Sequence, residues 1–290
     1  MARLAELGAR IRSLSELEEV VGALRSLSAV RVQQAQQTLS AIRQYARIIE
    51  DALADTVPSD AVALEAAMSS GLGATPAAAT LVVAFCSEHG FVGGFNERVL
   101  GPAAAHLQTS RDHLLIIGSR GVSSAAEHRF AVAWSRPMAS HPGGVNDVAL
   151  EVAEEIAVRA DQFARVVLVY ARGSGGASFR VSVETLLPFE LARRAPRRSM
   201  RPRPFAHLAP GRLFERLVDE LVFAEITRAA MESFASENAA RLQAMEAARD
   251  NIESKLGELE RLEREGRQEE ITTELLDIVT GAEALTNGEH

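Results

Sequence analysis

The sequence contains a single cysteine, Cys86, so no disulfide can form within the chain. Structural disulfides are typical of oxidising compartments, and Cys86 lies in an apolar run, so a reducing compartment such as the cytoplasm fits best. One cysteine cannot build a thiolate metal site, and no two of the seven histidines are spaced four residues apart. The sequence therefore predicts no metal centre.

Long hydrophobic runs are also missing. No stretch reaches the roughly 18 apolar residues that a membrane-spanning helix needs. The first residues, up to Arg12, are amphipathic and charged and lack the apolar core of a secretory signal. We therefore expect any association with a membrane to come through a partner or through the protein surface.

An excess of positive charge is absent. The net charge of -8 at pH 7 argues against general nucleic-acid binding, because phosphate contacts depend on clustered lysine and arginine. One local exception is a strip interleaved with Pro196 and Pro202, which we predict to be an exposed loop because proline disrupts regular structure. Two interpretations stay open for this strip: a contact with acidic partner groups or lipid headgroups, and a solvated loop. Its arginines are Arg193, Arg194, Arg197, Arg198, Arg201 and Arg203.

The motifs of common enzymes are missing too. No segment matches the phosphate-binding G-x-x-x-x-G-K-[ST] pattern, and Gly90-Phe-Val-Gly93-Gly94 lacks the G-x-G-x-x-G spacing of dinucleotide sites. We interpret these glycines as a tight turn between a strand and a helix. There is no G-x-S-x-G nucleophile elbow, and most carboxylates lie among exposed helical charges. We therefore predict no catalytic residues and no cofactor, and a small-molecule-binding α/β enzyme remains the less favoured alternative.

Helix breakers are scarce at both ends, because all ten prolines lie between Pro58 and Pro210. Apolar residues in the first segment recur in steps of three, four or seven, which predicts a helix up to Val57 of roughly 80 Å. The segment from Arg212 to about Leu285 has a similar stripe and predicts a helix of about 110 Å. Pairing the two helices antiparallel buries both stripes most simply. A bundle of shorter, broken helices is the alternative, because Gly22 and residues 26–28 are weak points.

The middle of the chain alternates between short apolar runs and amphipathic segments. This alternation is typical of an α/β layer with a largely parallel sheet. The resulting domain prediction is a helix over 1–57, a linker over 58–79, an α/β domain over 80–190, an Arg/Pro-rich loop over 191–211, a helix over 212–285 and a tail over 286–290. The predicted strands are Thr80–Phe85, His113–Ile117, Arg165–Tyr170 and Phe179–Leu187, and the predicted helices between them are Asn96–Leu107 and Asn146–Phe163.

Two segments near the end of the chain resemble ATP synthase gamma subunits. Residues 236–251, SENAARLQAMEAARDN, resemble the family signature S-E-x-A-A-R-M-x-A-M-x-x-A-x-x-N. Residues 267–282, RQEEITTELLDIVTGA, are similar to its R-Q-x-x-I-T-x-E-L-x-E-I-V-x-G-A terminus. Weaker similarities lie at residues 11–13, 87–96 and 117–121, so the resemblance spans nearly the whole chain.

The resemblance implies a fold of α/β plus coiled coil: an antiparallel two-helix coiled coil with a Rossmann-like middle domain. It further implies a non-catalytic rotor inside a ring of alpha and beta subunits, with epsilon and the membrane c-ring as further partners. Rotation of this shaft would couple ion flow to ATP synthesis or hydrolysis, because each beta subunit meets a different face of it. The implied location is peripheral, on the cytoplasmic face of the plasma membrane.

Site residues follow from the resemblance position by position. Arg267, Gln268 and Thr272 are implied to be polar contacts with a beta subunit. For Arg267 an ion pair with Glu263 or Glu270 is an equal alternative. The implied apolar tip, which turns in a sleeve of subunit surface, consists of Ile278, Val279, Ala282 and Leu285.

One departure leaves the working mode open. Where the family carries the basic stretch K-I-T-x-A-M-x-M-V-A, this chain has Glu19 to Ser28, EVVGALRSLS, with Glu18 beside it. Proton and sodium coupling, and synthesis and hydrolysis, all stay open because ion choice resides in the membrane ring. A coiled-coil scaffolding or adaptor protein is the alternative from another class.

Overall fold

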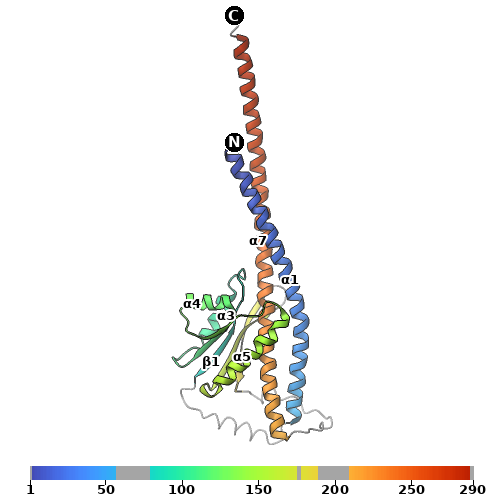
Figure 1. The fold of residues 1–290 in the computed structure, drawn as a ribbon, viewed down its shortest axis with the longest axis vertical. Coiled ribbons are helices and arrows are strands. Elements are labelled where there is room, and N and C mark those ends of the chain that lie inside the picture. The colour runs from blue at the N-terminus through green and yellow to red at the C-terminus, as the bar shows by residue number, and fades with distance from the viewer. Residues whose placement is uncertain (1, 57–78, 175–177, 189–208, 288–290) are drawn as a thin grey trace. The chain divides into compact units, whose positions relative to one another are not determined.

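The computed structural model describes residues 2–56, 79–174, 178–188 and 209–287 (Figure 1). Contacts group the chain into two compact units, one of residues before Ser28 together with those after Leu242, and one of residues 28–242. The elements, in order, are α1 (Ala2–Thr56), β1 (Thr80–Phe85), α3 (Phe95–Ala104), β2 (His113–Ile117), α4 (Ser119–Glu127), β3 (Val132–Arg136), a 3-10 turn (Pro142–Gly144), α5 (Val145–Arg159), a 3-10 turn (Ala160–Gln162), β4 (Arg165–Gly173), β5 (Phe179–Leu187) and α7 (Pro210–Asn287).

The larger unit, residues 28–242, is built on a five-stranded sheet of order β3-β2-β1-β4-β5. Strands β3, β2, β1 and β4 are parallel, and only β5 runs antiparallel, along β4. At the centre, Val83 of β1 is in register with Leu115 of β2 and Leu168 of β4. The sheet is parallel-rich and Rossmann-like, which confirms the predicted fold class.

Helices cover both faces of this sheet (Figure 1). On one face, Leu81, Val83 and Phe85 of β1 pack in a cluster with residues of α5 and α7. On the other face, Val82 and Ala84 pack in a cluster with residues of α3 and α4. A strand that is buried on both sides needs apolar residues throughout, and for this reason β1 is recognisable in the sequence as an unbroken apolar run.

Strand β3 and helix α4 were not predicted. Along β3, Val132-Ala-Trp-Ser-Arg136 alternates between half-buried and exposed side chains, because it is an edge strand covered on one face. Helix α4, SRGVSSAAE, has few large apolar residues and buries the small residues Gly121, Ser124 and Ala125. Neither segment therefore shows the apolar run or the broad stripe that marks the other elements.

Gly121 explains why α4 needs small residues. An added Cβ at this position would lie 2.1 Å from the Cβ of Cys86, at the end of strand β1. Gly118, just before α4, has a φ of 114°, which a residue with a side chain rarely adopts. The two glycines let the start of α4 pack directly against the chain that leaves β1.

Within the larger unit, α1 runs antiparallel along α7. Arg43 pairs with Glu232, and Tyr45, further along α1, donates a hydrogen bond to Glu220, which is earlier in α7. This hydrogen bond and partial burial raise the pKa of Tyr45 to about 12. Beyond these pairs the seam is apolar, with Ala46, Ile49, Leu53, Leu221 and Ala224 forming a buried cluster.

The smaller unit consists of the first part of α1 and the last part of α7, again antiparallel. Val21 of α1 packs in a buried cluster with Met245, Ile252 and Leu256 of α7. Leu4 of α1 lies next to Gly266 of α7, where an added Cβ would come within 2.9 Å of the leucine side chain. Helix α1 continues through Gly22 and residues 26–28, so the alternative of shorter, broken helices is wrong.

A search of the described residues finds no helix with the length and apolarity that a bilayer span requires.

We expect Gly121→Ala to lower the free energy of unfolding by about 1–3 kcal/mol, because the new methyl overpacks the contact with Cys86. Urea denaturation of the full chain measures the change. Gly101→Ala is the matched control, because a Cβ at this exposed position in α3 meets nothing within 4 Å. Alanine there is neutral or stabilising by up to about 1 kcal/mol. Equal effects of the two variants would contradict the packing account.

Candidate functional site

The end of α7 carries the predicted contact residues, and the side chains that the structure describes there are exposed. Arg267, Gln268 and Thr272 are exposed, and the exposed fractions of Ile278 and Val279 are 68% and 53%. Ala282 and Leu285 belong to the same helix, but their side chains lie outside the described part. The roles of all seven stay predictions.

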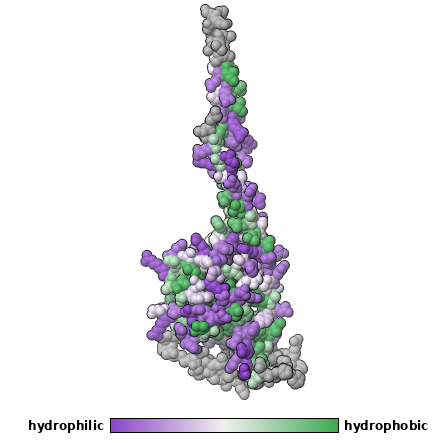
Figure 2. Space-filling view, in the orientation of Figure 1, coloured by the Kyte–Doolittle hydropathy of each residue, from purple (hydrophilic) through white to green (hydrophobic). Residues whose placement is uncertain are grey.

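Positions 267, 268, 272, 278 and 279 share one side of the helix, because at 3.6 residues per turn they fall within less than half of its circumference. Ile271, Leu275 and Leu276 are exposed between them, with exposed fractions of 58–60%. Figure 2 shows apolar side chains on the exposed part of this helix. Contiguous exposed apolar surface of this kind marks a site of interaction with another molecule.

The ion pair predicted between Arg267 and Glu263 is present. Nη2 of Arg267 lies 2.6 Å from Oε1 of Glu263, one turn earlier. The hydrogen bond to Glu263 raises the pKa of Arg267, whose side chain is 66% exposed. Next to it, the hydroxyl of Thr272 donates to the carbonyl oxygen of Gln268 at 2.8 Å, so these polar groups have partners within their own helix.

The arginine-rich strip cannot be placed, because it falls outside the residues that the structure describes. Its proposed contact with acidic groups stays a prediction. The residues concerned are Arg193, Arg194, Arg197, Arg198, Arg201 and Arg203.

A second candidate site is the buried ion pair that attaches the loop after β1 to α7. Arg241 and Glu237, one turn apart on α7, are 5% and 4% exposed, and their Nη2 and Oε1 atoms are 2.6 Å apart. The same Glu237 oxygen accepts the backbone N–H groups of Glu88 and His89 at 3.2 and 3.3 Å. Arg241 in turn donates to the carbonyl oxygens of His89 and Gly90.

The pair therefore binds both kinds of backbone group in this loop: Glu237 accepts hydrogen bonds from N–H groups, and Arg241 donates to carbonyl oxygens. The loop turns sharply at Phe91 and Gly93, which have φ values of 60° and 58°. Glu88 continues the network, because its carboxylate accepts the backbone N–H of Ser119 at 2.9 Å, at the start of α4, and that of Met138 at 2.7 Å. The N–H groups of Glu88 and His89 are already occupied by Glu237, which disfavours the use of this part of the loop as a phosphate cradle.

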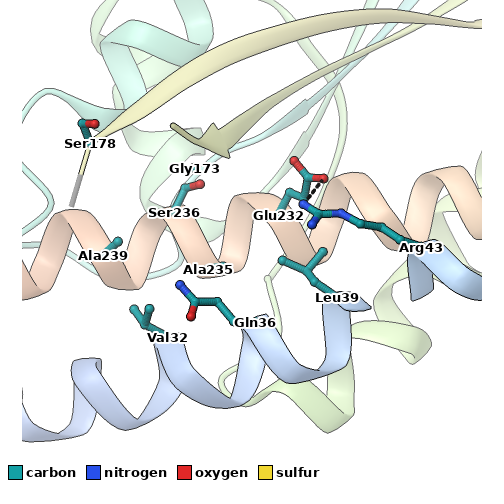
Figure 3. A pocket seen from close by; sticks show the side chains of 10 residues that line it. All are labelled: Val32, Gln36, Leu39, Arg43, Gly173, Ser178, Glu232, Ala235, Ser236 and Ala239. Atoms are coloured by element: carbon teal, nitrogen blue, oxygen red, sulfur yellow. Dashed lines mark hydrogen bonds and ion pairs between the residues drawn. The ribbon is translucent and has the colours of Figure 1, made fainter. Parts of the chain in front are cut away.

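A third candidate is a cavity of about 300 Å³ between α1, α7 and the ends of β4 and β5 (Figure 3). Its charged lining residues, Arg43 and Glu232, pair with each other at 3.1 Å. The hydroxyl oxygen of Ser236, another lining residue, is buried and makes no hydrogen bond to any described residue. Oε2 of Glu232 likewise makes no hydrogen bond there, but it lies 3.2 Å from Nε of Arg172, so the contact is an ion pair without hydrogen-bond geometry.

Several described side chains have pKa values moved away from their ordinary values by burial or by hydrogen bonds. Burial raises the pKa of the Cys86 thiol far above its usual range, and burial also raises that of Tyr170. Hydrogen bonds lower the pKa of Asp112 against the opposing effect of burial. Among the described residues no cluster of histidine, cysteine or carboxylate side chains could hold a metal ion.

The whole chain matches known proteins of one kind. A family model described as ATP synthase matches residues 3–285. The ATP synthase gamma chain of Bdellovibrio bacteriovorus is 27% identical, over 98% of this chain and 99% of the relative. The chain belongs to the ATP synthase gamma family. Another gamma chain, from Saccharopolyspora erythraea, is 29% identical over 99% of both chains.

The fold of this chain is also found among solved structures. A chain in the mitochondrial ATP synthase of Euglena gracilis, in a structure of OSCP, F1 and c-ring in rotational state 3, superposes with a TM-score of 0.70. The match covers 100% of this chain and 96% of that one at 16% sequence identity, so it supports the fold alone.

The ion pair gives a physical reason for the gamma-like signature that begins at Ser236. Within SENAAR, the acid and the base are Glu237 and Arg241, and the residues between them are small or polar. The sequence interpretation used these residues only to recognise the family and assigned them no structural role. The available signal was a set of charged residues spaced by three to five within an otherwise apolar or small-residue stretch of helix, at Glu225, Arg228, Glu232, Glu237 and Arg241.

We expect Arg241→Met to lower the free energy of unfolding by about 3–5 kcal/mol, because it leaves Glu237 buried without its cation. Arg249→Met is the matched control, since the Arg249–Glu253 pair is 46% and 48% exposed and contributes at most about 1 kcal/mol. Urea denaturation provides the free energies.

Labelling of Cys86 provides a second readout, because this buried thiol follows the strand that leads into the same loop. Under native conditions we expect alkylation of Cys86 to be slow in the natural protein and faster in Arg241→Met. Equal labelling rates in Arg241→Met and Arg249→Met would show that the pair does not hold the loop.

Proposed function

We propose that this chain is the central rotor of an F-type ATP synthase and couples ion movement through the membrane ring to ATP synthesis or hydrolysis in an alpha–beta hexamer. The observation that carries the proposal is the division of α7 into two kinds of surface. Residues 221–241 are largely buried in the larger unit, whereas residues 271–280 of the same helix are exposed and rich in apolar side chains. Membership of the gamma family supports the same role.

The exposed end of α7 is the surface that we assign to the hexamer. Apolar contacts are non-directional, so Ile278 and Val279 suit a bearing that must turn with little resistance. Ala282 and Leu285 extend this stripe in sequence. The polar residues Arg267, Gln268 and Thr272 lie earlier along the helix and are proposed to contact a beta subunit.

Catalysis in this proposal belongs to the other subunits of the complex. The chain lacks the G-x-x-x-x-G-K-[ST] and G-x-G-x-x-G motifs of nucleotide sites. The proposed partners are the alpha, beta and epsilon subunits and the c-ring. The proposed location is the cytoplasmic face of the plasma membrane, where the chain is held through the complex.

Co-expression tests the proposed function. We expect the chain, expressed with the alpha and beta subunits of its own organism, to co-purify in a complex that hydrolyses ATP, with one copy per three alpha and three beta subunits. Native mass spectrometry gives the stoichiometry, and an ATPase assay gives the activity. A stable oligomer of the chain alone, with no association with these subunits, would favour an adaptor role and reject the rotor.

The role of Arg267 is tested by changing each partner of its ion pair separately. If Arg267 contacts a beta subunit, Arg267→Gln slows ATP hydrolysis by the complex, whereas Glu263→Gln leaves the rate near that of the natural protein, because the guanidinium stays available. Steady-state ATPase assays on the purified complexes measure both. Equal slowing by the two variants would mean that the pair within the helix, and not the contact, is what matters.

A further inference from the structure

Glu232 is a carboxylate surrounded by arginines from three different elements. Its side chain is 1% exposed. Arg43 of α1 and Arg228 of α7 lie 3.1 and 3.5 Å from its Oε1, and Arg172 of β4 lies 3.2 Å from its Oε2. We name these four residues, Glu232, Arg43, Arg172 and Arg228, the arginine clasp.

Arg228 extends the clasp to the neighbouring strand. Its Nη2 lies 2.5 Å from Oε2 of Glu184 on β5, and its Nη1 donates to the hydroxyl of Tyr170 on β4 at 2.7 Å. It also pairs with Glu225, one turn earlier on α7. One connected set of charges therefore joins α1, α7, β4 and β5 within the larger unit.

The clasp is not needed to hold these elements together. Ala35 and Leu39 of α1, Ile226 and Met231 of α7, and Tyr170 already share one apolar cluster. Arg43 and Arg172 are 48% and 36% exposed, and ion pairs with such solvated partners contribute about 1 kcal/mol or less. For the buried Glu232 carboxylate, loss of hydration offsets much of the attraction. A contribution to folding stability therefore does not explain why four charged groups are gathered here.

The clasp adds contacts that oppose rolling and sliding of the helices against the sheet. Apolar contacts between helices resist separation but oppose rolling or sliding only weakly, since they are non-directional. Charged hydrogen bonds of arginine have defined geometry, and the contact between Arg43 and Glu232 is one of them. The ion pairs of Arg172 and Arg228 with Glu232 add attraction that weakens as the distance between the charges grows. Each arginine of the clasp reaches the same fixed carboxylate from a different element, so a rotation of α1 or α7 against the sheet must lengthen at least one of these contacts.

We propose that the arginine clasp is a torsional lock, which fixes the angular position of α1 and α7 against the sheet so that torque passes between them without slip. The torque itself rests on the proposed rotor function. Glu232 is the central positioning residue, and Arg43 is the contact that includes α1. Burial alone would lower the pKa of Arg228, but Glu225 and Glu184 raise it overall, so this member of the clasp stays charged at any physiological pH.

The lock itself is tested on the full chain without any partner. Spin labels at Ser40→Cys on α1 and Thr185→Cys on β5 report the distance between helix and sheet, because both positions are exposed and the buried Cys86 stays unlabelled. We expect Glu232→Gln and Arg43→Met to broaden the distance distribution. Arg47→Met is the matched control: Arg47 is exposed, one turn away, and donates to the carbonyl oxygen of Arg43 in its own helix. Unchanged widths in both clasp variants would overturn the lock.

Its consequence for coupling is tested in the complete complex in sealed vesicles. We expect Arg43→Met and Glu232→Gln to hydrolyse ATP at the normal rate without an ion gradient but to sustain a smaller maximum gradient than Arg47→Met, because a loosened lock slips under load. A merely structural role would lower hydrolysis and ion uptake in proportion, and that outcome, or an unchanged maximum gradient, would overturn the proposal. Failure of the proposed rotor function can be told apart from failure of the lock. If the rotor function is wrong, the complex with the natural chain shows no ATP-driven ion uptake. The distance measurement on the isolated chain then still tests the lock.

Discussion

Burial of one stretch of α7, residues 221–241, determines how the larger unit is assembled. Leu221, Ile226 and Met231 have no exposed surface. Four charged residues of the same stretch are almost as deeply buried: Glu225, Glu232, Glu237 and Arg241. A helix in this position has the sheet on one side and α1 on another, so it forms the core and not the surface of the larger unit. Charged groups can be tolerated there only if each finds a partner, and this requirement fixes where the neighbouring loop and strands must lie.

Two different polar networks meet that requirement. The Glu237–Arg241 pair binds backbone groups of the loop between β1 and α3, and it is local to that loop. The clasp around Glu232 joins side chains from α1, β4 and α7. The exposed end of α7 differs from this buried stretch, because its described apolar side chains are more than half exposed. One helix therefore combines a rigidly held segment with a segment suited to moving contact, which is what a rotor shaft needs.

The sequence was sufficient for most of the fold. The runs at Thr80–Phe85 and His113–Ile117 are buried on both faces, and they coincide with β1 and β2. Strand β3 and helix α4 were missed because an edge strand such as Val132–Arg136 has an exposed side, and α4 packs through Gly121 and small residues. A periodic pattern reveals an element through its large apolar side chains. It does not reveal close backbone packing at a glycine such as Gly121, which has no side chain.

The candidate sites were harder to predict for a related reason. Glu232 and Glu237 look like solvated helix charges in the sequence, since nothing local shows that Arg172 of β4 or the backbone of His89 lies beside them. Such pairs join residues far apart in the chain. The exposed residues near Ile278 could be assigned only through resemblance, because exposure of an apolar stripe indicates a partner without saying which one.

Rotation of the chain within the hexamer can be observed on single complexes. A fluorophore at Gln108→Cys, an exposed position in the larger unit, labels a single site because Cys86 is buried. With the alpha and beta subunits immobilised, the account predicts that the label turns stepwise in one direction when ATP is supplied. A label that keeps a fixed orientation while the complex continues to hydrolyse ATP would contradict it.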